Sequence, residues 1–187
     1  MKTSLDYIFD LYALHGSEDY IGEPVSQLEH MLQSGELARR EGQPDEVILA
    51  AFFHDLGHLL AFEGVVDHME GFGVVSHEKL GADLLRDAGF SERVASLVES
   101  HVEAKRYLTC KHPVYYDLLS EASKATLDLQ GGRMNDEEAI AFEKDPLFDL
   151  KIKLRYWDDE AKSTEPVGQS LAFYRELAEK HLHKTKY

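Results

Sequence analysis

Histidine is the residue type in this sequence that points most directly to chemistry. The 187 residues contain 10 histidines and one cysteine, Cys110. Histidines beside carboxylates are typical of metal sites and of acid–base chemistry. A lone cysteine excludes an internal disulfide and any multi-cysteine zinc or iron–sulfur site. Any reactive centre is therefore expected at the histidines.

The adjacent pair His54–Asp55 follows the most apolar segment of the chain, residues 47–53. A segment that is apolar on most faces is typical of a buried helix. Because a buried carboxylate without a partner is costly, the pair predicts a cation beside it. Next to an imidazole the simplest such cation is a metal ion. The alternative is an ordinary His–Asp pair at a helix end on the surface.

Two distant residues extend this pair into a pattern. His30 lies upstream in an amphipathic segment, and Asp158 lies downstream. Either one alone is more often an ordinary helix residue than a ligand. Taken in chain order, the residues are His, then His-Asp, then Asp. This pattern resembles the metal signature of the HD-domain superfamily, with His30, His54, Asp55 and Asp158 in its four positions.

His77 and His101 lie between the pair and the last aspartate. Binuclear HD proteins use two additional histidines in this interval for a second metal ion, whereas the alternative is that both are ordinary helix residues. The resemblance then implies four imidazole and two carboxylate ligands, with Asp55 bridging the two ions. Such a set without thiolates suits iron, zinc or manganese better than calcium or magnesium.

Longer stretches resemble one group in this superfamily, the mixed-valence di-iron oxygenases of the PhnZ/TmpB type, which cleave the carbon–phosphorus bond of organophosphonates. The segments that carry the resemblance are residues 19–30, 53–58, 75–78, 81–83, 101–108, 119–124 and 142–146. Together they cover most of the chain, from about residue 19 to residue 158. The inositol oxygenases are more distant di-iron relatives.

The resemblance also implies roles for residues around the metal ions. Tyr20 is expected to occupy the second iron until substrate displaces it. Glu23 is expected to move with Tyr20 and to help form the pocket for the substrate's amino group. Without the family, Tyr20 is equally well explained as a loop aromatic that shields the core. The residues expected to bind the phosphonate are His58, Lys105, Ser123, Thr126 and Arg155.

The activity implied is that of an oxidoreductase with an Fe(II)/Fe(III) pair and O2 as co-substrate. It would convert 1-hydroxy-2-aminoethylphosphonate to glycine, or the N-trimethyl analogue to glycine betaine, and release inorganic phosphate. The amine stays open, because spacing does not show which of Tyr20, Tyr107, Tyr115 and Tyr116 line the pocket. The alternatives are an HD phosphohydrolase acting on a nucleotide or phosphomonoester, and a non-catalytic HD domain that binds a signal.

Charge and composition limit the partners. Acidic residues number 35 against 20 basic ones, which gives a net charge of −15. This balance argues against binding to nucleic acid or to an anionic membrane, since both require a basic face. An anionic substrate then needs a local cationic pocket, which Lys105 and Arg155 beside two metal ions would supply. The acidic N-terminus is unlike a signal peptide and no segment reaches membrane-spanning length, so a cytoplasmic protein is expected.

The elements that position these residues are expected to be helices almost throughout. Predicted N-caps are Ser26, Ser76, Ser91, Asn135, Asp145 and Ser170. One helix is expected from Ser91 to about Leu108 and another from Pro146 through Ala161, with a glycine-containing loop at 61–75. Strand signals are nearly absent.

The expected fold class is therefore all-α, a compact HD-domain helical bundle that forms one domain over residues 1–187. Its motif-bearing core is expected at about residues 19–162, followed by a C-terminal helix at about residues 170–183. At the usual helix length, this corresponds to roughly seven to nine helices.

Overall fold

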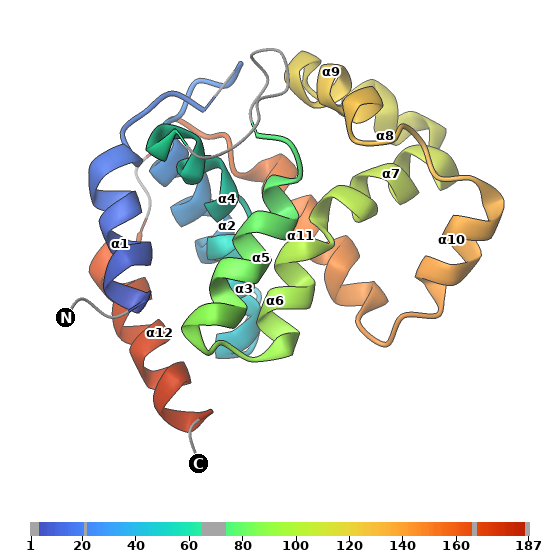
Figure 1. Cartoon of the computed structure of the whole chain (residues 1–187). Helices are drawn as coiled ribbons and strands as arrows, with labels where there is room; N and C mark the ends of the chain where they lie inside the picture. The colour runs from blue at the N-terminus through green and yellow to red at the C-terminus, as the bar shows by residue number, and fades with distance from the viewer. Residues whose placement is uncertain (1–3, 21, 65–73, 166–167, 186–187) are drawn as a thin grey trace.

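The structure, a computed structural model, describes residues 4–20, 22–64, 74–165 and 168–185. This part of the chain forms an all-helical bundle (Figure 1), which confirms the predicted fold class. Its α-helices are α1 (Ser4–His15), α2 (Gln27–Arg40), α3 (Asp45–Phe53), α4 (Leu56–Leu59), α5 (His77–Ala88), α6 (Glu92–Glu99), α7 (His101–Lys111), α8 (Pro113–Leu118), α9 (Glu121–Leu129), α10 (Asp136–Glu143), α11 (Phe148–Glu160) and α12 (Leu171–Lys184). A short 3₁₀ helix, η1 (Leu60–Glu63), follows α4.

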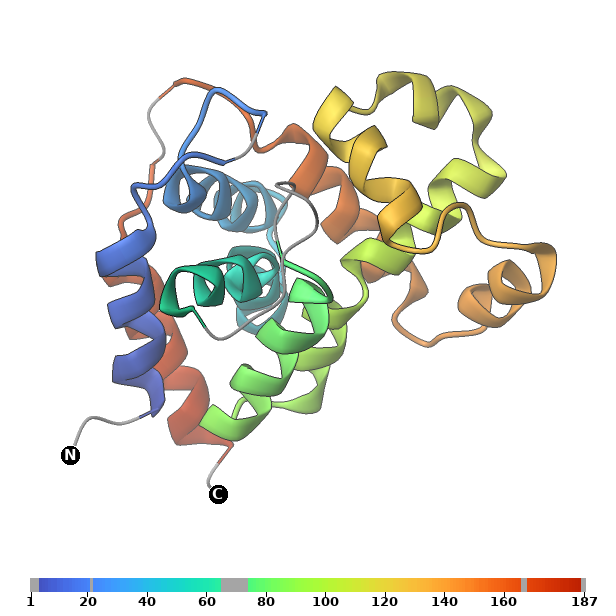
Figure 2. The ribbon, with the colours of Figure 1, turned by 45° about the horizontal axis from the view of Figure 1, so that its top comes forward.

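Helix α3 forms the centre of the bundle. Every residue from Val47 to Phe53 is buried. Helices α2, α6, α11 and α12 pack against it, and the two views in Figures 1 and 2 show it enclosed by other helices. Burial of this apolar surface stabilises the fold. It therefore fixes the end of α3, which the His54–Asp55 pair follows directly.

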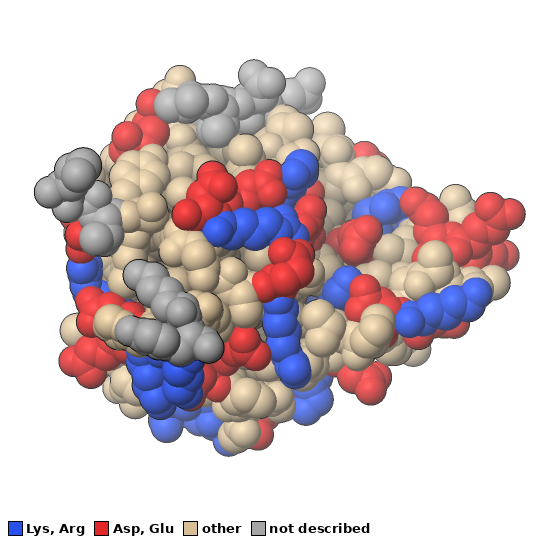
Figure 3. Space-filling view, turned by 60° about the horizontal axis from the view of Figure 1, so that its bottom comes forward, with Lys and Arg blue, Asp and Glu red and all other residues tan. Residues whose placement is uncertain are grey.

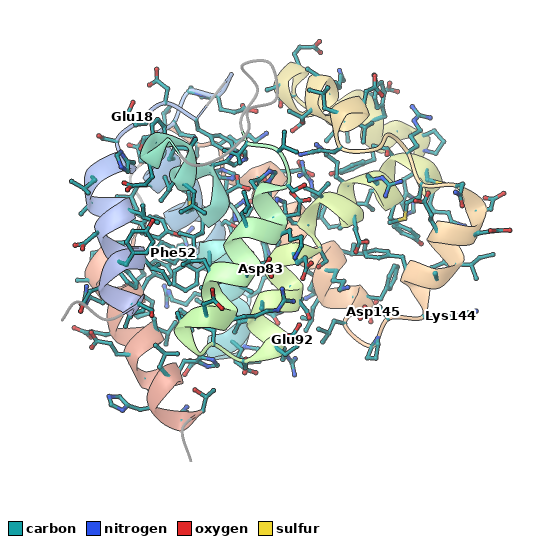
Figure 4. All side chains as sticks on the ribbon, viewed as in Figure 1. Glu18, Phe52, Asp83, Glu92, Lys144 and Asp145 are labelled. Carbon is teal, nitrogen blue, oxygen red and sulfur yellow. The ribbon has the colours of Figure 1, made fainter. Side chains whose placement is uncertain are left out.

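Aromatic side chains join the terminal helices to α3. The Phe52 ring stacks on Tyr12 of α1, with 4.9 Å between ring centroids, and on Tyr174 of α12, with 4.2 Å between centroids. Figure 4 shows Phe52 in the interior beside α1. Asp6 of α1 also forms an ion pair with Arg175 of α12. The sequence patterns did not predict α1, yet its buried face is part of the core.

Helices α7 to α10 extend from the bundle on the side opposite α1 and α12 (Figures 1 and 2). They have an apolar cluster of their own, formed by Ala104, Tyr107, Leu108, Tyr115, Leu119, Met134, Ala139 and Phe142. Helix α11 packs along α7 and along α2 and α3, so it connects this extension with the main bundle.

The predicted helix over residues 91–108 was wrong in one respect, because the chain forms two helices there. Helix α6 ends before Ser100 and α7 begins after it. The Ser100 hydroxyl donates a hydrogen bond to the Leu97 carbonyl, which satisfies an acceptor at the end of α6. Serine leaves the helical periodicity intact, so the sequence carried no signal of this break. As a result His101 begins a helix instead of lying within one.

Two other expectations need correction. Helix α11 begins at Phe148 instead of Pro146, because the Asp145 carboxylate accepts a hydrogen bond from the Leu147 N–H and forms a turn. The described residues contain twelve α-helices, more than the seven to nine expected, since α4 and α8 are short and α6 and α7 are separate. Part of the predicted 61–75 loop, residues 65–73, lies outside the described residues.

Most predicted caps are confirmed. Ser26 forms a capping box with Glu29 at the start of α2, and Asn135 forms another with Glu138 at the start of α10. Ser170 accepts a hydrogen bond from the Phe173 N–H. Ser76 and Ser91 also precede helices, although neither side chain makes a capping hydrogen bond.

Acidic and basic side chains alternate over the face shown in Figure 3. On α5 and α6, Arg86 forms ion pairs with Asp83, Glu92 and Glu99, and Figure 4 shows the labelled Asp83 and Glu92 on these two helices. Neighbouring carboxylates on α5 and α6 therefore neutralise the charge of Arg86. Within the described ranges, no helix combines the length and the apolar character needed to cross a membrane.

Candidate metal centre

The His54–Asp55 pair lies at the corner between α3 and α4. Helix α3 ends at Phe53, and Asp55 adopts a non-helical conformation (φ −102°, ψ 12°) immediately before α4. Both side chains are buried. The corner thus places a carboxylate and an imidazole in the interior, as the apolar segment before them predicted.

The Asp55 carboxylate lies between two pairs of histidines. Its Oδ2 atom is 3.5 Å from Nε2 of His30 and 3.4 Å from Nε2 of His54. Its Oδ1 atom is 3.4 Å from Nε2 of His77 and 3.3 Å from Nε2 of His101. All four histidines are buried. One carboxylate therefore contributes an oxygen to each of two separate groups of metal-binding side chains.

Asp158 of α11 joins the group formed by His30 and His54. Its Oδ1 atom is 3.4 Å from Nε2 of His30 and 3.7 Å from Nε2 of His54. Its Oδ2 atom accepts a hydrogen bond from Nη1 of Arg155 at 2.6 Å. Burial raises the pKa of Asp158, but the Arg155 charge together with the His30 and His54 imidazoles outweighs burial and holds that pKa well below its usual range. Asp158 is thus ionised and has one oxygen directed at the histidines.

Backbone carbonyls orient three of the four imidazoles. Nδ1 of His30 is 2.8 Å from the Ala161 carbonyl oxygen, and Nδ1 of His54 and of His101 are each 2.8 Å from the carbonyl oxygen three residues earlier. A carbonyl oxygen only accepts, so each of these Nδ1 atoms carries the proton. Each Nε2 atom then presents a lone pair to the centre.

The spacing of the imidazole nitrogens fits a metal ion. Nε2 of His30 and Nε2 of His54 are 3.0 Å apart, and Nε2 of His77 and of His101 are 2.9 Å apart. One metal ion bound by both nitrogens of a pair would account for this convergence. The Nδ1 atom of His77 has no hydrogen-bond partner among the described residues. Imidazole and carboxylate donors in this arrangement are a metal-binding set.

A glycine allows α5 to approach the centre. A Cβ atom at position 57 would lie only 2.0 Å from the carbonyl oxygen of His77, so the two backbones are in direct contact. Only glycine permits this approach. Sequence reasoning missed the role of Gly57, although a glycine two residues after Asp55, inside an otherwise helical pattern, indicates close backbone packing.

A cavity of about 340 Å³ opens beside this centre. The predicted site residues that line it are Tyr20, Glu23, Asp55, His58, His77, His101, Lys105, Ser123, Thr126, Arg155 and Asp158. His30 and His54 lie behind this lining. The fold therefore brings together all the residues that the sequence patterns selected, although their individual roles stay predictions.

Two aromatic side chains cover the histidine pairs on the cavity side. The Tyr20 ring stacks on His30, with 4.0 Å between centroids, and its hydroxyl donates a hydrogen bond to Asp55 Oδ2 at 2.9 Å. This contact lies on the His30 and His54 side of Asp55. The His58 ring stacks on His77, with 3.8 Å between centroids.

Lys105 places a buried cation in the cavity wall. It lies one turn after His101, and its Nζ donates to the Thr126 hydroxyl at 3.0 Å and to the Ser123 carbonyl at 3.4 Å. Burial, followed by the nearby Arg155 charge, lowers the pKa of Lys105 to about 7. An anion bound beside it would stabilise the protonated form.

Arg155 is engaged by acidic residues of its own helix. It forms ion pairs with Asp158 and Asp159, and its Nε donates to the Tyr115 hydroxyl at 2.9 Å. The Tyr115 hydroxyl donates in turn to Asp159. Sequence reasoning missed Asp159, although its spacing of four residues from Arg155 is that of a helical ion pair. Arg155 therefore orients the Asp158 carboxylate in addition to lining the cavity.

Three residues that the sequence did not select, Lys162, Gln27 and Gln130, contact or join the residues of this cavity. The Glu23 carboxylate accepts a hydrogen bond from Nζ of Lys162 at 2.7 Å. Gln27 and Gln130 also line the cavity, and the amide oxygen of each is buried without a hydrogen-bond partner among the described residues. No local pattern connects these residues, because they are far apart in the chain.

Among the four tyrosines left open by the sequence, Tyr20 is the one that lines the cavity. Tyr107 and Tyr115 donate hydrogen bonds to carboxylates elsewhere. The Tyr116 ring packs against two cationic side chains. Apart from histidines, Phe62 is the only other aromatic residue in the described part of the cavity lining.

A helical bundle that gathers two histidine pairs around one carboxylate, at the corner of a buried helix, is a metal-binding HD domain. The HD-domain family model matches residues 27–144, and the chain belongs to this family.

Three similar proteins show which members of the family this chain resembles. It is 41% identical, over 97% of this chain and 83% of the relative, to an uncharacterized protein of Acanthamoeba polyphaga mimivirus. It is 40% identical, over 86% of this chain and 81% of the relative, to the [1-hydroxy-2-(trimethylamino)ethyl]phosphonate dioxygenase (glycine-betaine-forming) of Leisingera caerulea. It is also 40% identical, over 83% of this chain and 76% of the relative, to the hydroxymethylphosphonate dioxygenase of Gimesia maris. The predicted kinship with HD-domain oxygenases is confirmed.

Proposed function

We propose that this protein is an oxidoreductase, a mixed-valence di-iron dioxygenase that cleaves the carbon–phosphorus bond of a 1-hydroxyphosphonate and releases inorganic phosphate. The observation that carries this proposal is the position of Asp55 between two histidine pairs in the wall of a cavity that also contains the buried Lys105. Two relatives that are 40% identical and are named phosphonate dioxygenases support the substrate class.

The donor groups support two iron ions that share Asp55. One ion would be held by His30, His54, Asp55 and Asp158, and the other by Asp55, His77 and His101. Imidazole and carboxylate ligands without thiolates suit iron. When bound, the ions would supply the redox chemistry with O2.

The protein's own residues would bind and orient the phosphonate. Lys105 would hold a proton beside a phosphonate oxygen and neutralise part of its charge. Ser123 and Thr126 lie in the same wall, and their hydroxyls would donate hydrogen bonds to the phosphonate. For this the Thr126 hydroxyl has to turn away from the Ala122 and Ser123 carbonyls, to which it donates in the structure. This local positive charge would offset the repulsion between an anionic substrate and a protein with a net charge of −15.

Tyr20 and Glu23 would control access to the centre. The Tyr20 hydroxyl is bonded to Asp55, so a substrate that binds near Oδ2 has to displace it. The Tyr20 ring also shields the His30 and His54 pair from water. A dry centre favours oxidation of the bound substrate over side reactions.

The described lining of the cavity favours a substrate with N–H donors. It contains the Glu23 carboxylate as an acceptor, and apart from histidines its aromatic rings are those of Tyr20 and Phe62. A primary ammonium supplies three donors, whereas a trimethylammonium supplies none and is best bound by several aromatic faces. We therefore propose 1-hydroxy-2-aminoethylphosphonate as substrate and glycine as product. The reaction balances as R–CH(OH)–PO3H2 + O2 → R–COOH + H3PO4, where R is CH2NH2.

Phosphate release with and without O2 tests the proposal. The iron-loaded protein should release phosphate from 1-hydroxy-2-aminoethylphosphonate only in the presence of O2, with one O2 consumed per phosphate. Phosphate esters that continue to be hydrolysed under strict anaerobiosis, with no reaction of the phosphonate, would instead indicate an HD phosphohydrolase. Equal turnover of the N-trimethyl analogue would refute the proposed preference for a primary ammonium.

The charge of the molecule and the size of the cavity also support a small-molecule partner. A cavity of about 340 Å³ suits a compact substrate, and a net charge of −15 disfavours nucleic acid. We propose a cytoplasmic location, where phosphonate oxidation would supply phosphate to metabolism.

A further inference from the structure

Lys162 follows the C-cap of α11, Ala161, and contacts Glu23 of the cavity lining. Its Nζ is 2.7 Å from Oε1 of Glu23, and the two side chains are only 17% and 9% exposed. Nζ is also 3.5 Å from the hydroxyl of Ser120, the N-cap of α9. Because the ion pair is largely shielded from water, its attraction is stronger than that of a pair on the open surface.

The residues on both sides of Lys162 are anchored. The Ala161 carbonyl accepts a hydrogen bond from His30 at 2.8 Å. The Ser163 N–H donates to Gln33 Oε1 at 2.9 Å, and Gln33 Nε2 donates to the Ser163 carbonyl at 2.7 Å. The backbone of Lys162 is therefore fixed against α2, and its ammonium group stays close to Glu23.

The two partners differ in their position relative to the cavity. Glu23 lines the cavity, whereas Lys162 is absent from its lining. Lys162 therefore neutralises the Glu23 carboxylate from outside the cavity. A cationic end group of a bound substrate would have to compete with Lys162 for the same carboxylate.

We propose that Lys162 is a positioning residue that holds Glu23 and masks its charge, and thereby sets how tightly the cavity binds substrates with a cationic end group. This inference rests on the proposed function, because it concerns the end of a hydroxyphosphonate remote from phosphorus. It assigns a specificity role to a residue outside the cavity, which acts through Glu23.

Replacement of Lys162 by methionine tests this role, since methionine keeps the length of the side chain and removes its charge. The Lys162→Met protein should bind 1-hydroxy-2-aminoethylphosphonate about tenfold more tightly than the parent, because Glu23 becomes available to the ammonium group. Binding of hydroxymethylphosphonate, which has no cationic group, should change by less than about twofold. Lys162→Arg keeps the charge and should restore the parental ratio of the two dissociation constants.

The measurement is isothermal titration calorimetry of the iron-loaded full chain under nitrogen with both phosphonates. In a Glu23→Gln background, Lys162→Met should have no further effect on the ratio. Lys153→Met is the matched control, because Lys153 forms an ion pair with Glu41 at 3.1 Å on the outside of α11, where both side chains are 47% exposed. It should change neither dissociation constant.

The outcomes separate the inference from the proposed function. A Lys162→Met protein whose affinities for the two phosphonates change in parallel would overturn the inference, since that result indicates a general structural effect. A parent protein that binds both compounds but releases no phosphate in O2 would overturn the proposed function alone, while the ratio of dissociation constants still decides the inference. A parent that binds neither compound would overturn both.

Discussion

At the scale of single residues, Asp55 connects the two halves of the centre. Its two oxygens face different histidine pairs, at 3.4–3.5 Å on one side and 3.3–3.4 Å on the other. Removal of its charge would leave each metal ion with one anionic ligand fewer. The other carboxylate of the centre, Asp158, faces only the pair formed by His30 and His54.

Asp55→Asn should therefore lower the affinity for both metal ions, about tenfold or more for each. Asp158→Asn should weaken one ion more than the other. Metal analysis after dialysis against a weak chelator, together with a titration that resolves the two sites, measures the difference. Asp83 is an exposed acidic residue on α5. The Asp83→Asn variant is the control and should keep both ions. Retention of one tightly bound ion in Asp55→Asn would contradict a bridging role.

Tyr20→Phe keeps the ring that stacks on His30 and removes the hydroxyl that donates to Asp55. Metal content should stay at the parental level, because the donor set is intact. Oxygen consumption in the absence of substrate should rise several-fold, since the hydroxyl no longer covers the carboxylate oxygen. An oxygen electrode, with and without substrate, gives both rates. Parental rates under both conditions would show that the hydroxyl does not protect the centre.

At the scale of elements, the centre is assembled at helix ends. Asp55 precedes α4, His77 begins α5, and His101 begins α7 after the break at Ser100. A side chain at a helix end can point along the helix axis into a space where several helices converge. The close contact at Gly57 fixes the first turn of α5 in this arrangement.

Gly57→Ala tests the contact between α4 and α5. The added Cβ would lie 2.0 Å from the His77 carbonyl oxygen, so the start of α5 has to move. The capacity of the proposed site at His77 and His101 to bind a metal ion should be lost first, and the protein should be destabilised by about 2–3 kcal/mol. Gly42→Ala is the control. A Cβ atom at position 42 meets no atom within 4 Å, so this variant introduces backbone strain at a φ of +70° without a clash. Parental metal content in Gly57→Ala would show that His77 does not depend on this contact.

His181 connects α12 with the start of α6. Its Nε2 accepts a hydrogen bond from the Ser91 N–H at 3.1 Å, and burial lowers the pKa of His181 below 6.5. Below about pH 6.5 the unfolded state therefore binds more protons than the folded state does. The contribution of the neutral His181 side chain to stability is present above that pH and is lost as the pH falls. Urea unfolding at pH 8 and pH 5.5 should show a smaller loss of stability for His181→Gln than for the parent. Equal losses would show that folding leaves the pKa of His181 unchanged.

At the scale of the whole molecule, the cavity is formed by two parts of the fold. Tyr20 and His58 come from the main bundle, whereas Lys105, Ser123 and Thr126 come from the extension that contains α7 and α9. The loop that precedes α2 contacts α9, since a Cβ atom at Gly22 would lie 2.9 Å from the Cβ atom of Ala122. Binding of an anion between these groups would link the two parts.

Metal removal should lower the thermal stability of the whole chain, because metal binding to the native state alone adds to its stability. A site loaded at a hundred times its dissociation constant contributes about 2.7 kcal/mol, which corresponds to a melting temperature about 5 °C or more higher for a chain of this size. Calorimetry with and without a chelator measures the shift. Asp55→Asn should show little response to the chelator. A parental melting temperature that is independent of the chelator would contradict a structural contribution of the metal.

The sequence by itself determined the local features of this protein. The cap at Ser26, the capping box at Asn135 and the buried segment at residues 47–53 all depend on patterns within a few residues. The order of the six candidate ligands, together with the longer family-like segments, indicated the class of centre. The predictions of the caps and of the buried segment succeed because helix periodicity and capping act over about one turn.

Only the tertiary structure decided how distant residues meet. It divided the helix at Ser100, directed Tyr115 toward Arg155 and away from the cavity, and paired Glu23 with Lys162 across 139 residues of chain. It also turned one oxygen of Asp55 toward each histidine pair. Such contacts depend on the packing of whole helices against one another, and no pattern within a single turn specifies that packing.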